Sequence, residues 1–134
     1  MMKFNKVLLV DDDEISNFIN TQVLMDINLA DDIMVAMNGQ EALELLRESY
    51  ETDDTFGRPE LIFLDLNMPI MDGFSFLQAC EFCKNGNIKV VVLSSSTNSK
   101  DMEAAQRFPQ VKYYLNKPLT ADKVEQALAA FSSN

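Results

Sequence analysis

The stretch 61-LIFLDLNMPIMDG-73 decides how the chain folds, because its character changes at one residue. Four apolar residues, Leu61–Leu64, run directly into the carboxylate of Asp65, and turn-forming residues that include Pro69 and Gly73 follow. A short apolar run bounded by turn signals predicts a strand buried on both faces. We therefore expect Asp65 at the rim of a sheet, near water, a metal ion or a cationic group, because an unpaired buried charge is costly.

Apolar runs and amphipathic segments alternate along the rest of the chain. Further strands are predicted at residues 6–10, 33–37, 88–93 and 111–115, each followed by a helix. A single helix is expected near residues 74–85, and a long loop is expected over residues 49–60. Five strands alternating with five helices are typical of an α/β fold, a doubly wound five-stranded parallel sheet covered by helices on both faces.

Three of the predicted helices carry an apolar stripe that is expected to face the sheet. The second helix has an N-cap at Asn38 and an acid three residues later, and the last has a plausible N-cap at Thr120. The stripes, from the first helix to the last, are Ile15, Phe18, Ile19 and Val23; Ala42, Leu45 and Leu46; and Val124, Ala127, Leu128 and Phe131.

Polar residues follow four of the predicted strands. Asp11 and Asp12 follow the first, Asp65 the third, Ser94 the fourth and Lys117 the fifth. Because ligand sites in open parallel sheets lie outside the carboxyl ends of the strands, these side chains are expected to meet at one edge. Such a group suits Mg²⁺ and a phosphoryl group, and carboxylate nucleophiles can form aspartyl phosphates.

Composition excludes several classes of function. The 134 residues predict one domain, and 21 acidic against 11 basic residues give a net charge of −10, which disfavours nucleic acid and anionic membranes as partners. No apolar run reaches the ~20 residues that span a bilayer and no signal peptide is visible, so a cytoplasmic location is expected. The chain has no histidine, which excludes Ser-His-Asp and Cys-His catalysis.

Cys80 and Cys83 form a Cys-x-x-Cys pattern, which suggests either a redox pair or half of a zinc site. Both fall within the predicted helix of residues 74–85 rather than at a helix start. No further cysteine or histidine exists to complete a zinc site. We therefore expect an ordinary structural role.

Taken together, the motifs resemble the receiver domain of two-component response regulators over essentially the whole chain. The matching fragments are Asp11-Asp12 after VLLV, 64-LDLNMPIMDG-73, Ser94 after VVVL, and Lys117-Pro118. The resemblance implies a flavodoxin-like (βα)5 fold with strand order 2-1-3-4-5. It also implies one receiver domain over residues 1–134, with no output domain, acting as a monomer or weak dimer.

The resemblance assigns roles at the rim of the sheet. Asp65 would accept a phosphoryl group from a phosphohistidine on a sensor histidine kinase or a histidine phosphotransfer protein. Asp12 would bind Mg²⁺ directly, Asp11 would assist through water, and the carbonyl of Asn67 would be a further ligand. Lys117 would pair first with Asp65 and then with the phosphoryl group.

The resemblance also implies a two-state switch. Ser94, where the family more often has threonine, would move toward the phosphoryl group, and Tyr114 would rotate inward. The bond between Lys117 and Pro118 would be cis, and the surface of residues 99–131 would signal by protein contact or onward phosphotransfer.

The resemblance implies a signalling domain that is not a turnover enzyme. Two other functions stay open. One is a Mg²⁺-dependent phosphatase of the haloacid dehalogenase type, which Asn67 disfavours because such enzymes have a second aspartate at that place. The other is a receiver-like docking module that is never phosphorylated. A third acid, Asp13, is expected to face solvent or the kinase rather than the metal.

Overall fold

The computed structural model describes residues 3–51, 57–85, 88–95 and 98–132. Five parallel strands form one sheet of order β2-β1-β3-β4-β5, as expected for a flavodoxin-like α/β fold. The strands are β1 (Phe4–Val10), β2 (Ala30–Ala36), β3 (Leu61–Leu64), β4 (Lys89–Ser94) and β5 (Val111–Asn116). The helices are α1 (Glu14–Asp26), α2 (Gly39–Glu51), α3 (Gly73–Ala79), α4 (Glu81–Asn85), α5 (Ser99–Gln106) and α6 (Ala121–Ser132).

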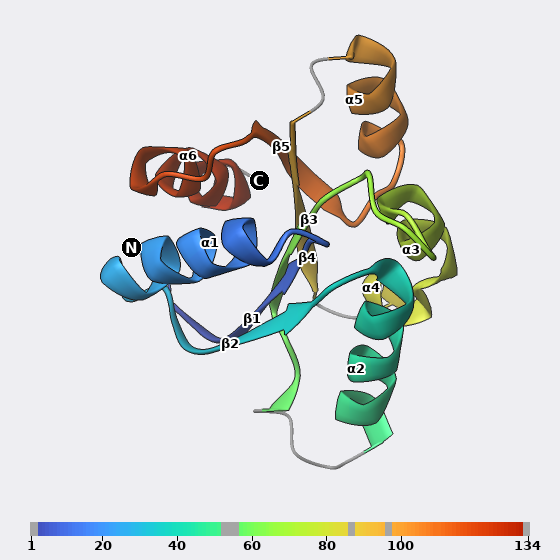
Figure 1. Cartoon of the computed structure of the whole chain (residues 1–134), viewed down its shortest axis with the longest axis horizontal. Helices are drawn as coiled ribbons and strands as arrows, with labels where there is room; N and C mark the ends of the chain where they lie inside the picture. The colour runs from blue at the N-terminus through green and yellow to red at the C-terminus, as the bar shows by residue number, and fades with distance from the viewer. Residues whose placement is uncertain (1–2, 52–56, 86–87, 96–97, 133–134) are drawn as a thin grey trace.

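The sheet lies between two helical layers. Helices α1 and α6 cover one face, and α2, α3, α4 and α5 cover the other (Figure 1). Successive side chains of a strand point to opposite faces, so Val7 and Leu9 of β1 join the core beneath α1 and α6, while Leu8 and Val10 join the core beneath α2 and α3. Burial on both faces explains why the central strands are continuous apolar runs.

The register of the central strands brings the predicted site residues to one edge. Val10 of β1 is paired with Leu64 of β3, and Asp65 N donates to Val10 O at 2.9 Å. Asp11 and Asp65 therefore leave adjacent strands at the same level. From β1 the strand order runs to β2 on one side and to β3 on the other, which is the switch point where open α/β sheets bind ligands.

In helix α1 the side that is buried differs from the predicted apolar stripe. Ile15, Phe18 and Ile19 are 71, 68 and 49% exposed, and the buried residues of the helix are Asn17, Asn20 and Leu24. The carboxylate of Asp13 caps α1 by accepting from Ile15 N and Ser16 N, at 2.9 and 3.4 Å, and this sets where the helix begins. The helix then packs with the opposite side against the sheet, and most of the predicted stripe faces outward.

The segment predicted as one helix over residues 74–85 is two helices in the structure. Helix α3 ends at Ala79, and the extended backbone of Cys80 (φ −81°, ψ 94°) interrupts the helical path before α4 begins at Glu81. The sulfurs of Cys80 and Cys83 are bonded to each other, and both side chains are buried in the core beneath α2 and α3. The prediction that both cysteines lie within one helix was wrong.

Smaller differences concern the edge of the sheet and α2. Strand β2 begins at Ala30, three residues before the prediction, where exposed Asp31 and Asp32 form ion pairs with Lys3 and Lys6 of the neighbouring segment. Helix α2 continues to residue 51, so the predicted loop of residues 49–60 begins later, and its residues 52–56 lie outside the described part.

Two predicted caps are confirmed by hydrogen bonds. Glu41 N donates to Asn38 Oδ1 at 2.9 Å, and Lys123 N donates to Thr120 Oγ1 at 3.2 Å. Across the described residues, no helix is both long and apolar enough to cross a bilayer.

Candidate functional site

Three carboxylates meet at the carboxyl edge of the sheet. One oxygen each from Asp11, Asp12 and Asp65 lies within 4.8 Å of the others. Asp11 and Asp65 are 4 and 6% exposed, whereas Asp12 is open to solvent. Clustered carboxylates repel one another unless a cation neutralises them, and hard oxygen donors of this kind suit Mg²⁺. The donor set therefore fits the predicted magnesium ion.

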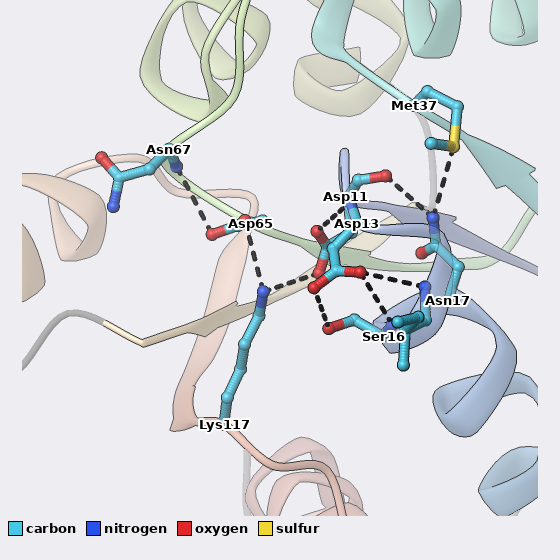
Figure 2. A network of polar contacts seen from close by, with 9 residues as sticks. Asp11, Asp13, Ser16, Asn17, Met37, Asp65, Asn67 and Lys117 are labelled. Carbon is cyan, nitrogen blue, oxygen red and sulfur yellow. Dashed lines mark hydrogen bonds and ion pairs between the residues drawn. The ribbon is translucent and has the colours of Figure 1, made fainter.

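Lys117 reaches this cluster from the end of β5. Its Nζ lies 2.7 Å from Asp11 Oδ2 and 3.3 Å from Asp65 Oδ2 (Figure 2). The peptide bond to Pro118 is cis, as predicted. Lys117 is thus shared between two carboxylates and lies closer to Asp11, whereas the family resemblance implied a pair with Asp65.

Burial and the neighbouring charges shift the pKa of both Asp65 and Lys117. Burial raises the pKa of Asp65, and the neighbouring Asp11 adds to this, while the charge of Lys117 opposes it only in part. For Lys117, burial alone would lower the pKa. The hydrogen bond to Asp11 and the charges of Asp65 and Asp11 outweigh burial, so the pKa of Lys117 is raised.

The turn after β1 is held by its own carboxylates. Asp11 Oδ1 accepts from Asp13 N at 3.0 Å, and the carboxylate of Asp13 caps α1. The helical N–H groups of Ser16 and Ile15 hold the pKa of Asp13 below its ordinary value. Asp13 is exposed and is not one of the three clustered carboxylates. That it faces solvent or the kinase rather than the metal stays a prediction.

The turn after β3 is held by Gly73 and Asn67. Gly73 N donates to Leu66 O at 3.0 Å, and a Cβ at this glycine would lie 2.6 Å from Asp65 O and 2.8 Å from Leu66 Cα. Only glycine permits this approach, which packs the start of α3 against the backbone of Asp65. The side chain of Asp65 is held within the same turn, because Asn67 N donates to Asp65 Oδ1 at 3.4 Å.

The predicted switch residues lie beside the cluster. Ser94 is fully buried at the end of β4, on the same face of that strand as Val92. Tyr114 is half-buried and packs against the small core formed by Leu66, Val92 and Ala105. Both predicted switch residues are thus on the side of the sheet that α5 covers.

An open cleft of about 660 Å³ leads to the carboxylates, and sequence reasoning missed two of its features. Ser95 lines it, although only the neighbouring Ser94 was predicted as a site residue. Ile15 also lines it, and the exposed side chains of Phe18 and Ile19 continue this apolar face along α1. Apolar residues at helical spacing usually face the core, so the sequence alone did not indicate this surface.

Comparison with known proteins agrees with this geometry. Residues 7–129 match the model of the response regulator receiver domain. A two-component response regulator from Cytophaga hutchinsonii has the same fold, with a TM-score of 0.84, 32% identity, and coverage of 98% of this chain and 99% of that one. A chain of the CheX–CheY–BeF3–Mg²⁺ complex from Borrelia burgdorferi gives a TM-score of 0.77 at 26% identity, with 96% of this chain and 89% of that chain covered.

The probable C4-dicarboxylate response regulator DctR of Bacillus subtilis is 28% identical over 126 residues, which are 94% of this chain but 51% of DctR. The chain therefore spans about half the length of that relative.

The chain belongs to the response regulator receiver domain family, and its acidic site with Lys117 is that of a phosphorylatable receiver of two-component signalling.

Proposed function

We propose that Asp65 accepts a phosphoryl group from a phosphohistidine on a histidine kinase or a histidine phosphotransfer protein. The observation that carries this proposal is the position of Asp65, a buried carboxylate that is held between Lys117 and the Asp11–Asp12 pair and lies at the base of an open cleft. An oxygen of Asp65 would attack phosphorus, and the bond from phosphorus to the imidazole nitrogen of the donor would break. The imidazole leaves with that bonding pair and takes up a proton.

Chain residues prepare this step by charge and by hydrogen bonds. Asp65 must be ionised to attack, and the charge of Lys117 favours the ionised form, which offsets in part the effect of burial on the pKa of Asp65. The ammonium group of Lys117 can then bind an oxygen of the transferred phosphoryl group. Ser95 already lines the cleft, and Ser94 is the hydroxyl that we propose moves toward the phosphoryl group.

The ion that the carboxylates would hold is Mg²⁺. Asp12 and Asp65 would bind it, with Asp11 through water and the backbone carbonyl of Asn67 as a further ligand. When bound, Mg²⁺ would neutralise the charge on the phosphoryl oxygens and on the carboxylates.

We further propose that phosphorylation changes the surface through which the protein contacts other proteins. In this proposal the receiver over residues 1–134 signals and does not turn over a substrate. Ser94 would couple the phosphoryl group to Tyr114, and the outer surface of α5, β5 and α6, residues 99–131, would change its contacts. Packing of Tyr114 against Ala105 of α5 supports this route.

Phosphorylation by a small donor tests the proposed function directly. Incubation with acetyl phosphate and Mg²⁺ is expected to add the mass of one phosphoryl group, and EDTA is expected to prevent it. Because acyl phosphates are labile to base, the adduct should disappear at high pH. If neither acetyl phosphate nor a purified histidine kinase produces an adduct, the chain is a docking module. Catalytic turnover of phosphate esters would instead indicate the phosphatase.

Asp12→Ala is expected to weaken Mg²⁺ binding at least about tenfold, since losing even an outer partner of a metal ligand costs 10- to 100-fold. Asp12 is exposed, so the fold should tolerate the change. Titration calorimetry measures the affinity. Glu14→Ala removes a neighbouring exposed acid that is outside the cluster and is the matched control. Equal losses in both variants would mean that general negative charge, and not a ligand, attracts the ion.

The apolar face of α1 is where we propose that the protein donor docks. Phe18 is 68% exposed, and Ile15 on the same face lines the cleft to Asp65. Phe18→Ser is expected to raise the KM for a phosphorylated protein donor about tenfold, the effect of losing one interface anchor of about 1.4 kcal/mol. The rate with acetyl phosphate should not change, because that donor needs no docking surface.

The control for this variant is Met102→Ser on α5, which removes an exposed apolar side chain away from the cleft. Met102→Ser should change neither the KM for the protein donor nor the rate with acetyl phosphate. Slower reaction of Phe18→Ser with acetyl phosphate would show damage to the site and would contradict the docking role.

A further inference from the structure

The buried amide of Asn17 in α1 contacts the acidic turn without belonging to the carboxylate cluster. Asn17 Nδ2 donates to Asp11 O at 2.8 Å and to Met37 Sδ at 3.5 Å (Figure 2). The residue is 4% exposed and lies on the side of α1 that faces the sheet. An apolar side chain would normally occupy such a position, so the amide needs a specific explanation.

Stability does not explain the amide. Asn17 Oδ1 is buried and accepts no hydrogen bond from any part of the chain that the structure describes. A buried acceptor without a partner is destabilising, and this offsets what the Nδ2 hydrogen bonds contribute. The reason for an asparagine here must therefore lie in what its Nδ2 group holds in place.

What Nδ2 holds is the peptide group between Asp11 and Asp12. A peptide group is planar, so fixing its carbonyl fixes the orientation of the backbone from which both carboxylates leave. Asp11 N donates to Ala36 O at 3.1 Å, and Asp11 Oδ1 accepts from Asp13 N at 3.0 Å. The hydrogen bond from Asn17 completes this set from the helix side.

The same amide ties the turn to two other elements. Asn17 N donates to Asp13 O at 3.0 Å, in the first turn of α1, and Met37 follows β2 directly. Asn17 is thus a point at which α1, the end of β2 and the acidic turn are held together. A shift of α1 would be transmitted through this amide to the Asp11–Asp12 peptide.

We propose that Asn17 is a positioning residue for the metal site: its Nδ2 group orients the Asp11–Asp12 peptide so that both carboxylates converge with Asp65. The inference rests on the proposed binding of Mg²⁺ by that cluster. Asn17 touches neither the ion nor the phosphoryl group. Its loss should therefore reduce the affinity of the site while leaving the fold intact.

The test is Asn17→Leu, measured by titration calorimetry with Mg²⁺ and by thermal unfolding without it. We expect an affinity about tenfold or more below that of the wild type, the usual cost of losing a residue that orients a metal ligand. The melting temperature should stay close to that of the wild type, because leucine removes the unpaired Oδ1 but also takes the Nδ2 donor away from Asp11 O. A purely structural role would predict the reverse, with lower stability and unchanged affinity.

Asn20→Leu is the matched control, because Asn20 is 5% exposed on the same side of α1, about one turn further on. Within the described residues it makes no hydrogen bond to the acidic turn. Its Mg²⁺ affinity should equal that of the wild type. If Asn17→Leu does not fold, Asn17→Ala removes the same donor without adding volume and should show the same loss.

Three outcomes are informative. Loss of affinity in the Asn17 variants alone supports the positioning role. An affinity of Asn17→Leu within twofold of the wild type, or equal losses in the Asn17 and Asn20 variants, overturns it. If wild-type protein itself binds no Mg²⁺, the proposed metal site fails and the inference fails with it.

Discussion

Asp65→Asn is expected to abolish phosphorylation by acetyl phosphate and by a protein donor, without unfolding the domain. Asparagine has nearly the same shape, but its amide is not a nucleophile toward phosphorus. Asp65 is 6% exposed, and its neighbours Lys117 and Asp11 can still pair at 2.7 Å. Intact mass after incubation with acetyl phosphate and Mg²⁺ measures the effect.

The control for this variant is Asp72→Asn, which changes an acid in the same segment. Asp72 caps α3 by accepting from Ser75 N at 2.8 Å, and asparagine can do the same. Asp72→Asn should be labelled like the wild type. A normal adduct on the same segment of Asp65→Asn would place the acceptor elsewhere.

The same variant should also change the dependence of stability on pH. Burial raises the pKa of Asp65 above its value of 3.8 in the unfolded chain, so the folded protein holds this proton more tightly. The contribution of Asp65 to wild-type stability in the absence of metal therefore decreases as the pH rises from about 3.8 through the folded pKa. Asp65→Asn lacks this loss, so its stability relative to the wild type should increase across that window. Urea unfolding at several pH values measures the difference, and a constant difference would contradict the raised pKa.

Lys117→Ala is expected to slow phosphorylation by acetyl phosphate about 10²- to 10³-fold, the usual cost of removing one group that stabilises developing negative charge. Some phosphorylation should persist, since Asp65 is still present. On phosphorylation, the wild type is expected to change to its activated conformation and to show a changed spectrum. The phosphorylated variant should not show this change, because no ammonium group then links the phosphoryl group to the end of β5.

Affinity for Mg²⁺ separates two roles for this lysine. If Lys117 only supplies charge, its removal leaves Asp11 and Asp65 more negative, and Mg²⁺ should bind as tightly or more tightly. Weaker binding would mean that the lysine organises the cluster. Lys123→Ala is the matched control, because Lys123 is half-buried and donates to Asn116 O and Pro118 O, both at 2.8 Å, without reaching the carboxylates. A loss of rate in Lys123→Ala equal to that in Lys117→Ala would indicate damage to this loop instead.

Local patterns were sufficient to predict the central sheet. The strand at Leu61–Leu64 has the predicted boundaries, because a strand buried on both faces can accept only apolar residues and ends where the first charge appears. The meeting of Asp11, Asp65 and Lys117 followed from the same logic, since parallel strands end at one edge. Each of these predictions depends on chain order and burial, which the sequence carries directly.

The face of α1 could not be predicted in this way. A helix with apolar residues at 15, 18 and 19 and polar residues at 17 and 20 ordinarily buries the apolar side. Here the opposite side of the helix faces the sheet. This orientation is found together with the cap at Asp13 and the hydrogen bond from Asn17 Nδ2 to Asp11 O. Hydrogen bonds to groups distant in sequence leave no periodic signal, so hydrophobic periodicity favoured the wrong side.

The sequence by itself determined the fold class, the strand order through its family motifs, and the set of charged residues at the sheet edge. It could do so because burial and chain connectivity act on every residue of a strand. Only the tertiary structure decided that Lys117 lies closer to Asp11 than to Asp65, that the helix of residues 74–85 breaks at Cys80, and that Asn17 holds the acidic turn. These features depend on distances between side chains of different elements, and such distances exist only once the elements have packed.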